Sequence, residues 1–369
     1  MFENYNFKRY GVFLVITCIV ASVIGILLIG SAKEGLQDKQ IQGLVIGLVV
    51  MLVLSIIDYH FILKFYWVLY ALSIALLIAV RLYGATVGGA SRWFTVFGIR
   101  FQPSELVKIL LILFYAQFIM KHRDSINTFR MVISSVLLLL PPFYLIFDQP
   151  DLSTSIMILA IFATIMLVGG LSFKIIIPAI AIIIPLVILF LNIVMQPDQT
   201  ILNDYQQKRI LAWLQPEQYA STEAYQQLNS ITAIGSGQLS GKGLNNNVIS
   251  SVKNGNFISE AQTDFIFSIA GEELGFVGCC GIIILLFLIV LQCIYIAARA
   301  MDTAGMIIAG GMAGLVGFQT FINIGVTTML LPDTGLPLPF FSYGQTSLVS
   351  LFIGIGIVLN VKLQSVDFL

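Results

Sequence analysis

The chain alternates long apolar runs with polar connections over its whole length. A helix needs about 20 mostly apolar residues to cross the hydrocarbon core of a bilayer, and the first run, residues 10–30, is long enough. Prolines inside two later runs are compatible with spans, because membrane helices tolerate them as kinks. We predict ten membrane-spanning helices, near residues 10–30, 41–57, 61–80, 103–120, 130–147, 153–170, 173–195, 276–298, 303–330 and 343–361.

Two connections are longer than the rest. Residues 81–102 contain glycines and Trp93, whereas residues 196–263 are rich in Gln, Asn, Ser and Tyr. Long loops in compact proteins are usually functional or disordered, and the aromatic content of the second loop argues for partial order. The fold class predicted is therefore an all-α integral membrane protein. We expect one polytopic domain, residues 1–369, with an extracytoplasmic loop at about 196–263 between spans seven and eight.

Composition supports the membrane assignment. Hydrophobic residues make up 58% of the chain and charged residues 10%, against roughly 25% charged residues in ordinary soluble domains. A water-soluble globule could not hide so much apolar surface, and a disordered chain would show the opposite balance. The net charge of zero gives no reason to expect nucleic-acid binding. The four cysteines lie inside apolar runs without metal-ligand spacing.

The charges of the loops predict the orientation in the membrane. Ten spans place both termini on the same side. With the N-terminus in the cytoplasm, the inner segments hold nine Lys and Arg residues and the short outer loops hold five. Long loops are excluded from this comparison, and an excess of positive charge marks the cytoplasmic side. We therefore expect a multi-pass protein of the bacterial cytoplasmic membrane with both termini inside.

Charged residues within the spans are functional candidates, because a charge near the bilayer centre costs at least about 2.5–3.5 kcal/mol. Glu105 and Lys108 lie three residues apart at the start of a span and would share one helix face. They could form a structural ion pair or shape a polar cavity for a charged ligand. Asp151 stands in the short outer turn before span six, where it could simply cap the following helix.

Asp264 closes the long outer loop. The apolar stretch after it continues to Ala300, which is too long for one perpendicular crossing. We expect a helix that starts near Asp264 at the outer surface, carries Glu272 and Glu273 near the interface, and becomes a span after Gly275. Asp264 could cap that helix, or it could be a carboxylate at the wet mouth of a membrane cavity. With an ordinary pKa of about 3.9 it would be ionised at neutral pH and could act as a general base on a hydroxyl.

A glycine-rich loop, residues 235–243, precedes Asp264 and contains Lys242. Its spacing fits neither the P-loop nor the dinucleotide-binding pattern, because Ser240 and Gly243 stand where those motifs need other residues. We therefore expect no nucleotide. The backbone N–H groups beside one cation could hold a diphosphate; the alternative is a plain mobile turn.

A proline-rich segment, residues 331–345, reads LPDTGLPLPFFSYGQ and contains Ser342. Its three prolines and two glycines forbid a continuous helix. Non-helical backbone at membrane depth survives only where it is buried in protein or lines a cavity. We expect a re-entrant or outer-surface loop that plugs the bundle, or a rigid connection between the last two spans.

Together these motifs resemble the SEDS family (shape, elongation, division and sporulation), whose members include RodA and FtsW. The resemblance runs the whole length of the chain, and LPLP at residues 336–339 is closer to the RodA branch. The matching segments are GASRW at 89–93, QPSE at 102–105 with Lys108, QPDL at 149–152, AIGSG at 233–237 with GKG at 241–243, TDFIF at 263–267 with EELG at 272–275, and LPLPF at 336–340 with SYG at 342–344.

The resemblance implies an enzyme that polymerises peptidoglycan glycan strands from lipid II outside the cytoplasmic membrane. Asp264 matches the family's essential aspartate, and Glu105 and Lys108 match its polar pair beside a central cavity. It further implies a class B penicillin-binding protein and elongation or division complex proteins as partners, and a divalent cation, Mg²⁺ or Mn²⁺, as cofactor. The other residues that we expect at the site are Arg92, Asp151, Lys242, Glu272 and Ser342.

The expected reaction is an inverting glycosyl transfer. The donor linkage of lipid II is α and the product linkage is β, so one displacement with a general base suffices, unlike retaining chemistry. Asp264 would take the hydroxyl proton of the acceptor. Lys242, Arg92 or a bound cation would stabilise the departing diphosphate.

The chain departs from the family pattern near the aspartate. Ser259 and Gln262 stand where the family commonly has Pro and His, and Gln345, Ser153 and Gln238 replace glycines. None of these changes removes Asp264, but an imidazole that places the acceptor cannot operate here. Two alternatives stay open: a flippase for lipid-linked oligosaccharides, and a non-catalytic scaffold that docks a transpeptidase.

Overall fold

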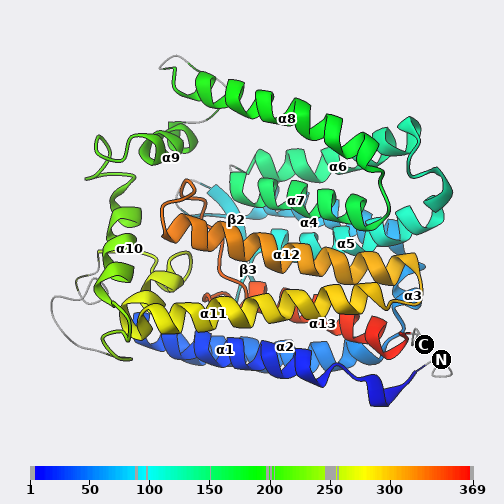
Figure 1. Ribbon diagram of the computed structural model, residues 1–369, viewed down its shortest axis with the longest axis horizontal. Helices are drawn as coiled ribbons and strands as arrows, with labels where there is room; N and C mark the ends of the chain where they lie inside the picture. The colour runs from blue at the N-terminus through cyan, green and yellow to red at the C-terminus, as the bar shows by residue number, and fades with distance from the viewer. Residues whose placement is uncertain are drawn as a thin grey trace.

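The computed structural model describes residues 5–87, 90–96, 99–149, 151–196, 199, 202, 204–245, 255 and 257–365. Its long helices run side by side in one bundle (Figure 1). The helices are α1 (Val12–Ala32), α2 (Gln37–Ile56), α3 (Tyr59–Leu63), α4 (Tyr66–Tyr83), α5 (Pro103–Lys121), α6 (Phe129–Phe147), α7 (Leu152–Val168), α8 (Phe173–Val194), α9 (Asp204–Leu214), α10 (Tyr225–Ser236), α11 (Ile266–Ala298), α12 (Thr303–Thr327) and α13 (Gln345–Leu363).

The all-α membrane fold predicted from the apolar runs is confirmed. Nine helices of the described chain are long and apolar enough to cross a membrane, and α7, with 17 residues, is a shorter apolar helix. These ten helices coincide with the ten predicted spans. The third starts later than predicted because the short helix α3 occupies residues 59–63, and the ninth ends earlier, at Thr327.

A small sheet between α4 and α5 was not predicted. Three antiparallel strands, β1 (Ala85–Val87), β2 (Ala90–Val96) and β3 (Ile99–Phe101), pair in the order β1-β2-β3. Their β-branched and aromatic residues favour strands, but the glycines of this region obscured the pattern. Arg92, expected at the site, falls in β2, and its side chain lies outside the described part of the structure.

Helix α11 starts next to Asp264 and continues into a span, as expected, but it contains a break at Gly275 that was not predicted. This residue has φ 66° and ψ −166°, a backbone conformation that glycine adopts far more readily than other residues. The glycine-rich loop packs into the break, where Gly241 lies so close that a Cβ on it would stand 2.2 Å from the carbonyl oxygen of Glu273. The loop and the helix break are therefore one interlocked unit.

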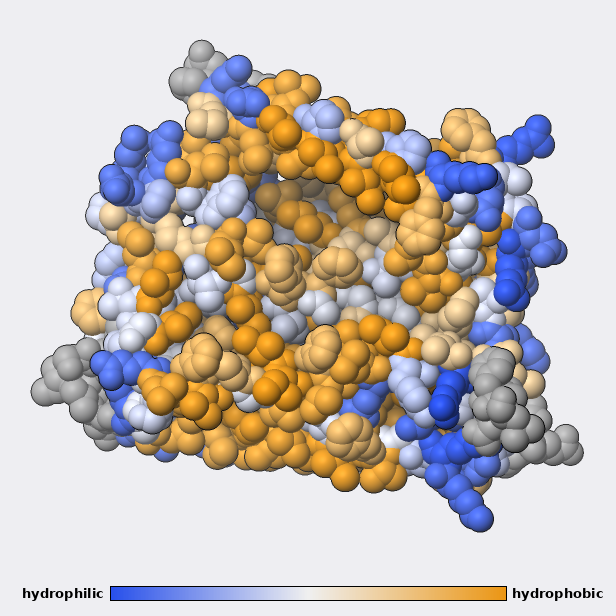
Figure 2. Space-filling model, in the orientation of Figure 1, coloured by the Kyte–Doolittle hydropathy of each residue, from blue (hydrophilic) through white to orange (hydrophobic). Residues whose placement is uncertain are grey.

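Helix α8 stands apart from the bundle. Among its residues only Val194 is buried, and side chains around the helix, such as Phe173, Ile177 and Ile182, are exposed by 63–67%. Figure 2 shows a hollow with apolar walls between α8 and the helices below it. This arrangement leaves an apolar groove that opens along the side of the bundle.

Both chain ends lie at one end of the bundle, and α9 and α10 of the long loop lie at the other (Figure 1). The backbone N–H of Asn6 donates to the carbonyl oxygen of Leu363 at 3.0 Å, which ties the two termini together. This placement agrees with an even number of crossings. Which end faces the cytoplasm stays a prediction.

Candidate active site

Asp264 lies just before α11, at the end of the bundle that carries the long loop. Phe265 occupies the N-cap position of α11, so the alternative that Asp264 caps this helix is wrong. Asp264 as a residue is half-buried, and it directly precedes the start of α11, which lies at the end of the bundle away from the termini (Figure 1).

The proline-rich segment folds over Asp264 as a buried plug. Residues 328–344 form no helix, and Leu336, Leu338 and Phe341 are at most 3% exposed. This confirms the expectation of non-helical backbone buried in protein. Gly25 of α1 permits the close approach, because a Cβ there would lie 2.6 Å from the Cα of Phe341.

A cation that was not predicted lies beside Asp264. Arg209 of α9 pairs with Asp333 of the proline-rich segment, with Nη2 at 3.3 Å from Oδ2. Gly335, with φ +72°, stands between the groups: a Cβ on it would lie 3.3 Å from Asp264 Oδ2 and 3.9 Å from Arg209 Nη1. The long loop thus brings a guanidinium and a second carboxylate to the aspartate. Arg209 carried no signal in the sequence beyond being a cation within that loop.

The surroundings raise the pKa of Asp264 to about 7. Burial is the main cause, because it disfavours the charged form. The charge of Asp333 adds to the effect, Arg209 opposes it, and Glu260 and Asp151 contribute further repulsion. The expectation of an ordinary carboxyl pKa is therefore wrong. A base whose pKa matches the ambient pH is well suited to take a proton and release it again.

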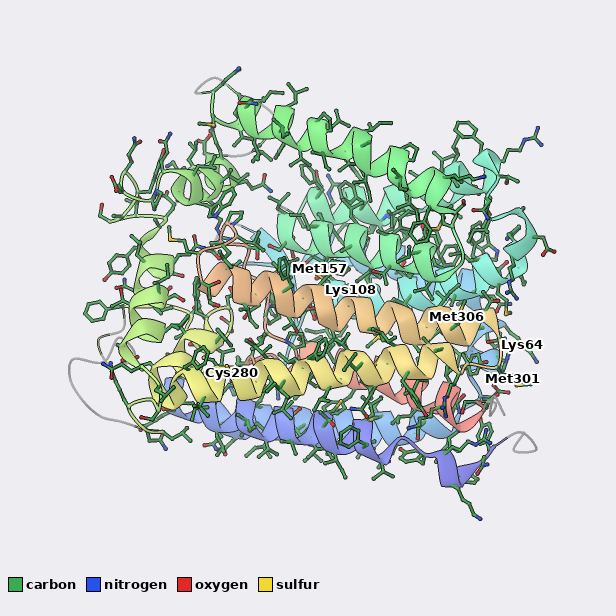
Figure 3. All side chains as sticks on the ribbon, viewed as in Figure 1. Lys64, Lys108, Met157, Cys280, Met301 and Met306 are labelled. Carbon is green, nitrogen blue, oxygen red and sulfur yellow. The ribbon has the colours of Figure 1, made fainter. Side chains whose placement is uncertain are left out.

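Glu105 and Lys108 form a buried ion pair, and Figure 3 places Lys108 inside the bundle. Lys108 Nζ lies 2.8 Å from Glu105 Oε1 and donates to Gln319 Oε1 at 3.0 Å. Ser347 donates to the other oxygen of Glu105 at 2.7 Å. These contacts support the alternative that Glu105 and Lys108 form a structural ion pair, because they tie α5 to α12 through Gln319 and to α13 through Ser347.

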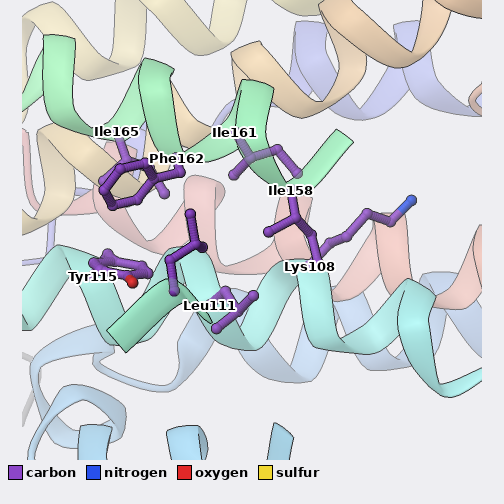
Figure 4. A pocket seen from close by; sticks show the side chains of 8 residues that line it. Lys108, Leu111, Tyr115, Ile158, Ile161, Phe162 and Ile165 are labelled. Atoms are coloured by element: carbon purple, nitrogen blue, oxygen red, sulfur yellow. The ribbon is translucent and has the colours of Figure 1, made fainter. Parts of the chain in front are cut away.

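The cavity beside Lys108 is apolar. It has a volume of about 10 Å³, which is room for about one water molecule. Figure 4 shows the Lys108 ammonium pointing away from the apolar lining. The lining residues are Lys108, Leu111, Tyr115, Leu139, Ile158, Ile161, Phe162 and Ile165. In this conformation the cavity therefore offers no place for a charged ligand.

Asp151 caps α7 and also lies close enough to Asp264 for its charge to act there. Its Oδ1 accepts from the backbone N–H of Thr154 at 3.1 Å, as the capping alternative expected. The next residue but one, Ser153, donates its hydroxyl to the carbonyl of Thr334 in the proline-rich segment. The start of α7 is thus held against the plug.

Lys242 and Glu272 pair with each other. Lys242 Nζ lies 2.6 Å from Glu272 Oε1, whose side chain is 1% exposed. The backbone N–H groups of Lys242 and Gly243 donate to the carbonyls of Glu272 and Glu273, both at 3.0 Å. These contacts give the glycine-rich loop a structural role, locking it to α11. Diphosphate binding by Lys242 stays untested.

The described residues hold no cluster of three or more His, Cys, Asp or Glu side chains that could bind a metal ion. Asp264 and Asp333 approach one another, but Arg209 already neutralises part of their charge. The described side chains around Asp264 therefore do not form a protein-held site for Mg²⁺ or Mn²⁺.

Known proteins resemble this chain over nearly its whole length. Residues 6–366 match the family of FtsW, RodA and SpoVE, described as cell cycle protein. This chain belongs to that family. It is 34% identical over 351 residues to the peptidoglycan glycosyltransferase MrdB of Escherichia coli, covering 94% of this chain and 91% of that protein. It is 31% identical to a probable peptidoglycan glycosyltransferase FtsW of Geobacter metallireducens, covering 97% and 98%.

Solved structures share the fold. A peptidoglycan synthase complex, studied for its coordination of polymerization and crosslinking, matches with a TM-score of 0.80 at 27% identity, covering 96% of this chain and 97% of that one. The rod shape determining protein RodA of Thermus thermophilus matches with a TM-score of 0.69 at 26% identity, covering 97% and 96%. The chain is therefore a multi-pass membrane protein of the RodA and FtsW type.

Proposed function

We propose that this protein is a peptidoglycan glycosyltransferase that polymerises lipid II at the outer face of the cytoplasmic membrane. The observation that carries the proposal is Asp264: a half-buried carboxyl beside Arg209, with its pKa near 7, in a chain of the family whose named relatives are peptidoglycan glycosyltransferases. A general base needs this combination of partial burial, access and a pKa close to the working pH.

The reaction forms one bond and breaks one. The 4-hydroxyl of an acceptor GlcNAc attacks the anomeric carbon of the donor MurNAc, and Asp264 takes the hydroxyl proton. The bond from that carbon to the diphosphate oxygen breaks, and undecaprenyl diphosphate leaves with the electron pair. A single displacement converts the α linkage to β, so no carboxylate nucleophile is needed. Positioning two lipid-anchored substrates supplies much of the remaining acceleration.

Arg209 is the cation that we assign to the leaving group. Its guanidinium lies at the same end of the bundle as Asp264, on the other side of Gly335. Arginine matches phosphate geometry with two parallel N–H donors. Asp333 orients this guanidinium before the substrate arrives. Dependence on Mg²⁺ or Mn²⁺ remains a separate proposal, with the cation arriving on the substrate diphosphate.

The prenyl tails would stay in the groove between α8 and the bundle. Its walls are apolar (Figure 2), and the side chains of α8 are exposed around the helix. An apolar groove open along the side of a membrane protein suits a lipid chain that must enter and leave sideways. It also leads toward the loop end, where Asp264 lies.

A partner of the transpeptidase type fits this function, because polymerised strands must be cross-linked. We propose a class B penicillin-binding protein, together with elongation or division complex proteins. The structural likeness to a peptidoglycan synthase complex supports this choice.

We further propose that both termini are cytoplasmic, because this places Asp264 outside, where the glycan strand grows.

The test is polymerisation of labelled lipid II by the purified protein with its transpeptidase partner. Asp264→Asn should abolish polymer, since loss of a general base costs about 10²–10⁴-fold. Asp38→Asn, at an exposed acid of α2, is the matched control and should polymerise normally. Unchanged polymer from the Asp264 variant would refute the base role and favour a scaffold, whereas lipid II movement across liposomes without polymer would favour a flippase.

A further inference from the structure

The segment that carries Asp264 is held by hydrogen bonds to three of its successive backbone carbonyls. The carbonyl oxygens of residues 262, 263 and 264 each accept a hydrogen bond from the C-terminal part of the chain. The donors are the backbone N–H of Tyr343 to Gln262 at 2.8 Å, the hydroxyl of Ser342 to Thr263 at 2.5 Å, and the side-chain amide of Asn323 to Asp264 at 2.8 Å. The segment lies outside the regular helix, and within it the backbone N–H of Thr263 closes a single turn on the carbonyl oxygen of Glu260 at 3.1 Å.

Asn323 makes the contact to Asp264 itself. It lies on α12 and is 1% exposed. Its Nδ2 donates to two carbonyl oxygens at once, that of Asp264 at 2.8 Å and that of Leu336 at 2.7 Å. One buried amide therefore joins the segment carrying the carboxylate to the proline-rich plug.

The next turn of α12 supports the same plug. Gln319, four residues before Asn323, is fully buried and donates from Nε2 to the carbonyl of Pro337 at 2.9 Å. Its Oε1 accepts from Lys108, which Glu105 holds in turn. Residues four apart share a helix face, so one face of α12 fixes two adjacent carbonyls of the plug. The buried ion pair thus belongs to the framework around Asp264.

We propose that Asn323 is a positioning residue for glycosyl transfer and acts through the backbone of Asp264. The inference rests on the proposed base role of that carboxylate. Displacing a reacting group by about 1 Å can cost 10²-fold in rate, and supporting hydrogen bonds are what hold such groups in place. The hydrogen bonds that Asn323 donates go to backbone carbonyls only, so its loss should not weaken substrate binding.

Loss of the amide should also change the protonation of Asp264. Burial is the main reason for its raised pKa, and burial depends on the segment being held under the plug. A released segment would let water reach the carboxylate, and its pKa would fall toward the ordinary value. A merely structural defect elsewhere would lower the amount of folded protein without moving the pH dependence.

The test is the pH dependence of lipid II polymerisation by Asn323→Leu, a substitution of similar size without donors. We expect kcat to fall roughly 10–100-fold, KM for lipid II to stay within about twofold, and the midpoint of the acid limb to move down by at least about one pH unit. Gln227→Leu is the matched control. Gln227 is buried and also donates to two carbonyls, those of Val326 and Leu331, so it holds the first residue of the plug without bonding to the carbonyls of residues 262–264.

The outcomes separate the two proposals. An unmoved acid limb in Asn323→Leu, or the same movement in Gln227→Leu, overturns the positioning role. If Asn323→Leu does not fold, Ser342→Ala decides, because it removes the adjacent bond to Thr263; an unchanged limb and rate there overturn the inference too. Polymer from Asp264→Asn refutes the base role itself, and with it the route through which Asn323 acts.

Discussion

The raised pKa of Asp264 makes a prediction about stability that does not depend on activity. The carboxyl goes from an ordinary pKa of 3.8 to about 7 on folding, so the folded state binds the proton more tightly than the unfolded state. The contribution of this carboxyl to the free energy of unfolding is therefore fully present below pH 3.8. It is lost as pH rises from there through 7. Asp264→Asn removes the ionisation, and the variant should be more stable than the parent at pH 8.

The magnitude follows from the two pKa values. Each tenfold change in proton affinity is worth about 1.4 kcal/mol, so the full cost of ionising Asp264 in the folded state is at most about 4 kcal/mol. About 2–3 kcal/mol of this falls between pH 5 and pH 8. The free energy of unfolding of Asp264→Asn, minus that of the parent, should grow by this amount over that range.

The assay is denaturant unfolding of both proteins in the same detergent, followed by tryptophan fluorescence at pH 5, 6, 7 and 8. Asp38→Asn, the exposed control, should show no growing difference. A stability difference between Asp264→Asn and the parent that stays constant from pH 5 to pH 8 would show that the carboxyl titrates far below 7. The argument that burial and Asp333 prepare it as a base would then be wrong.

Four further predictions test the surroundings. Arg209→Ala should lower kcat by about 10–10³-fold. It should also move the acid limb of the pH profile to higher pH, because a positive charge that opposes protonation of Asp264 is lost. Lys208→Ala, at the exposed neighbour in α9, should do neither in the same assay. Glu105→Gln should lower the free energy of unfolding by about 3–5 kcal/mol, because it leaves a buried ammonium unpaired. Adding Lys108→Met should restore part of that loss. A larger loss in the double variant would contradict the structural role of the pair. The imidazole of His60 lies 2.9 and 3.1 Å from two aspartates, which raise its pKa chiefly through the hydrogen bond that the ring donates to Asp302. The contribution of His60 to the free energy of unfolding is fully present below the ordinary pKa of about 6.5 and is lost as pH rises through the raised value. His60→Gln should therefore flatten the dependence of unfolding free energy on pH in that window. An identical dependence in the variant would refute the ion pairing. Chelation by EDTA should slow polymerisation and Mg²⁺ or Mn²⁺ should restore it; full activity in EDTA would rule out the cation.

Local features of the sequence determined the membrane architecture. Hydropathy is a property of each run of residues, so the positions of the ten spans could be predicted from it. The proline-rich segment was identified for the same reason, because the backbone restrictions of proline act within a few residues. The resemblance to the family also followed from short ordered motifs, and it is confirmed.

Tertiary structure alone decided the chemistry around Asp264. Arg209, Asn323 and Asp333 are separated from it by 55–69 positions along the chain, and no periodicity brings them to one carboxylate. The pKa near 7 depends on burial and on these neighbours, because desolvation and Coulomb interactions act through space. The same holds for Lys242, whose charge meets Glu272 only when the glycine-rich loop closes on the break in α11.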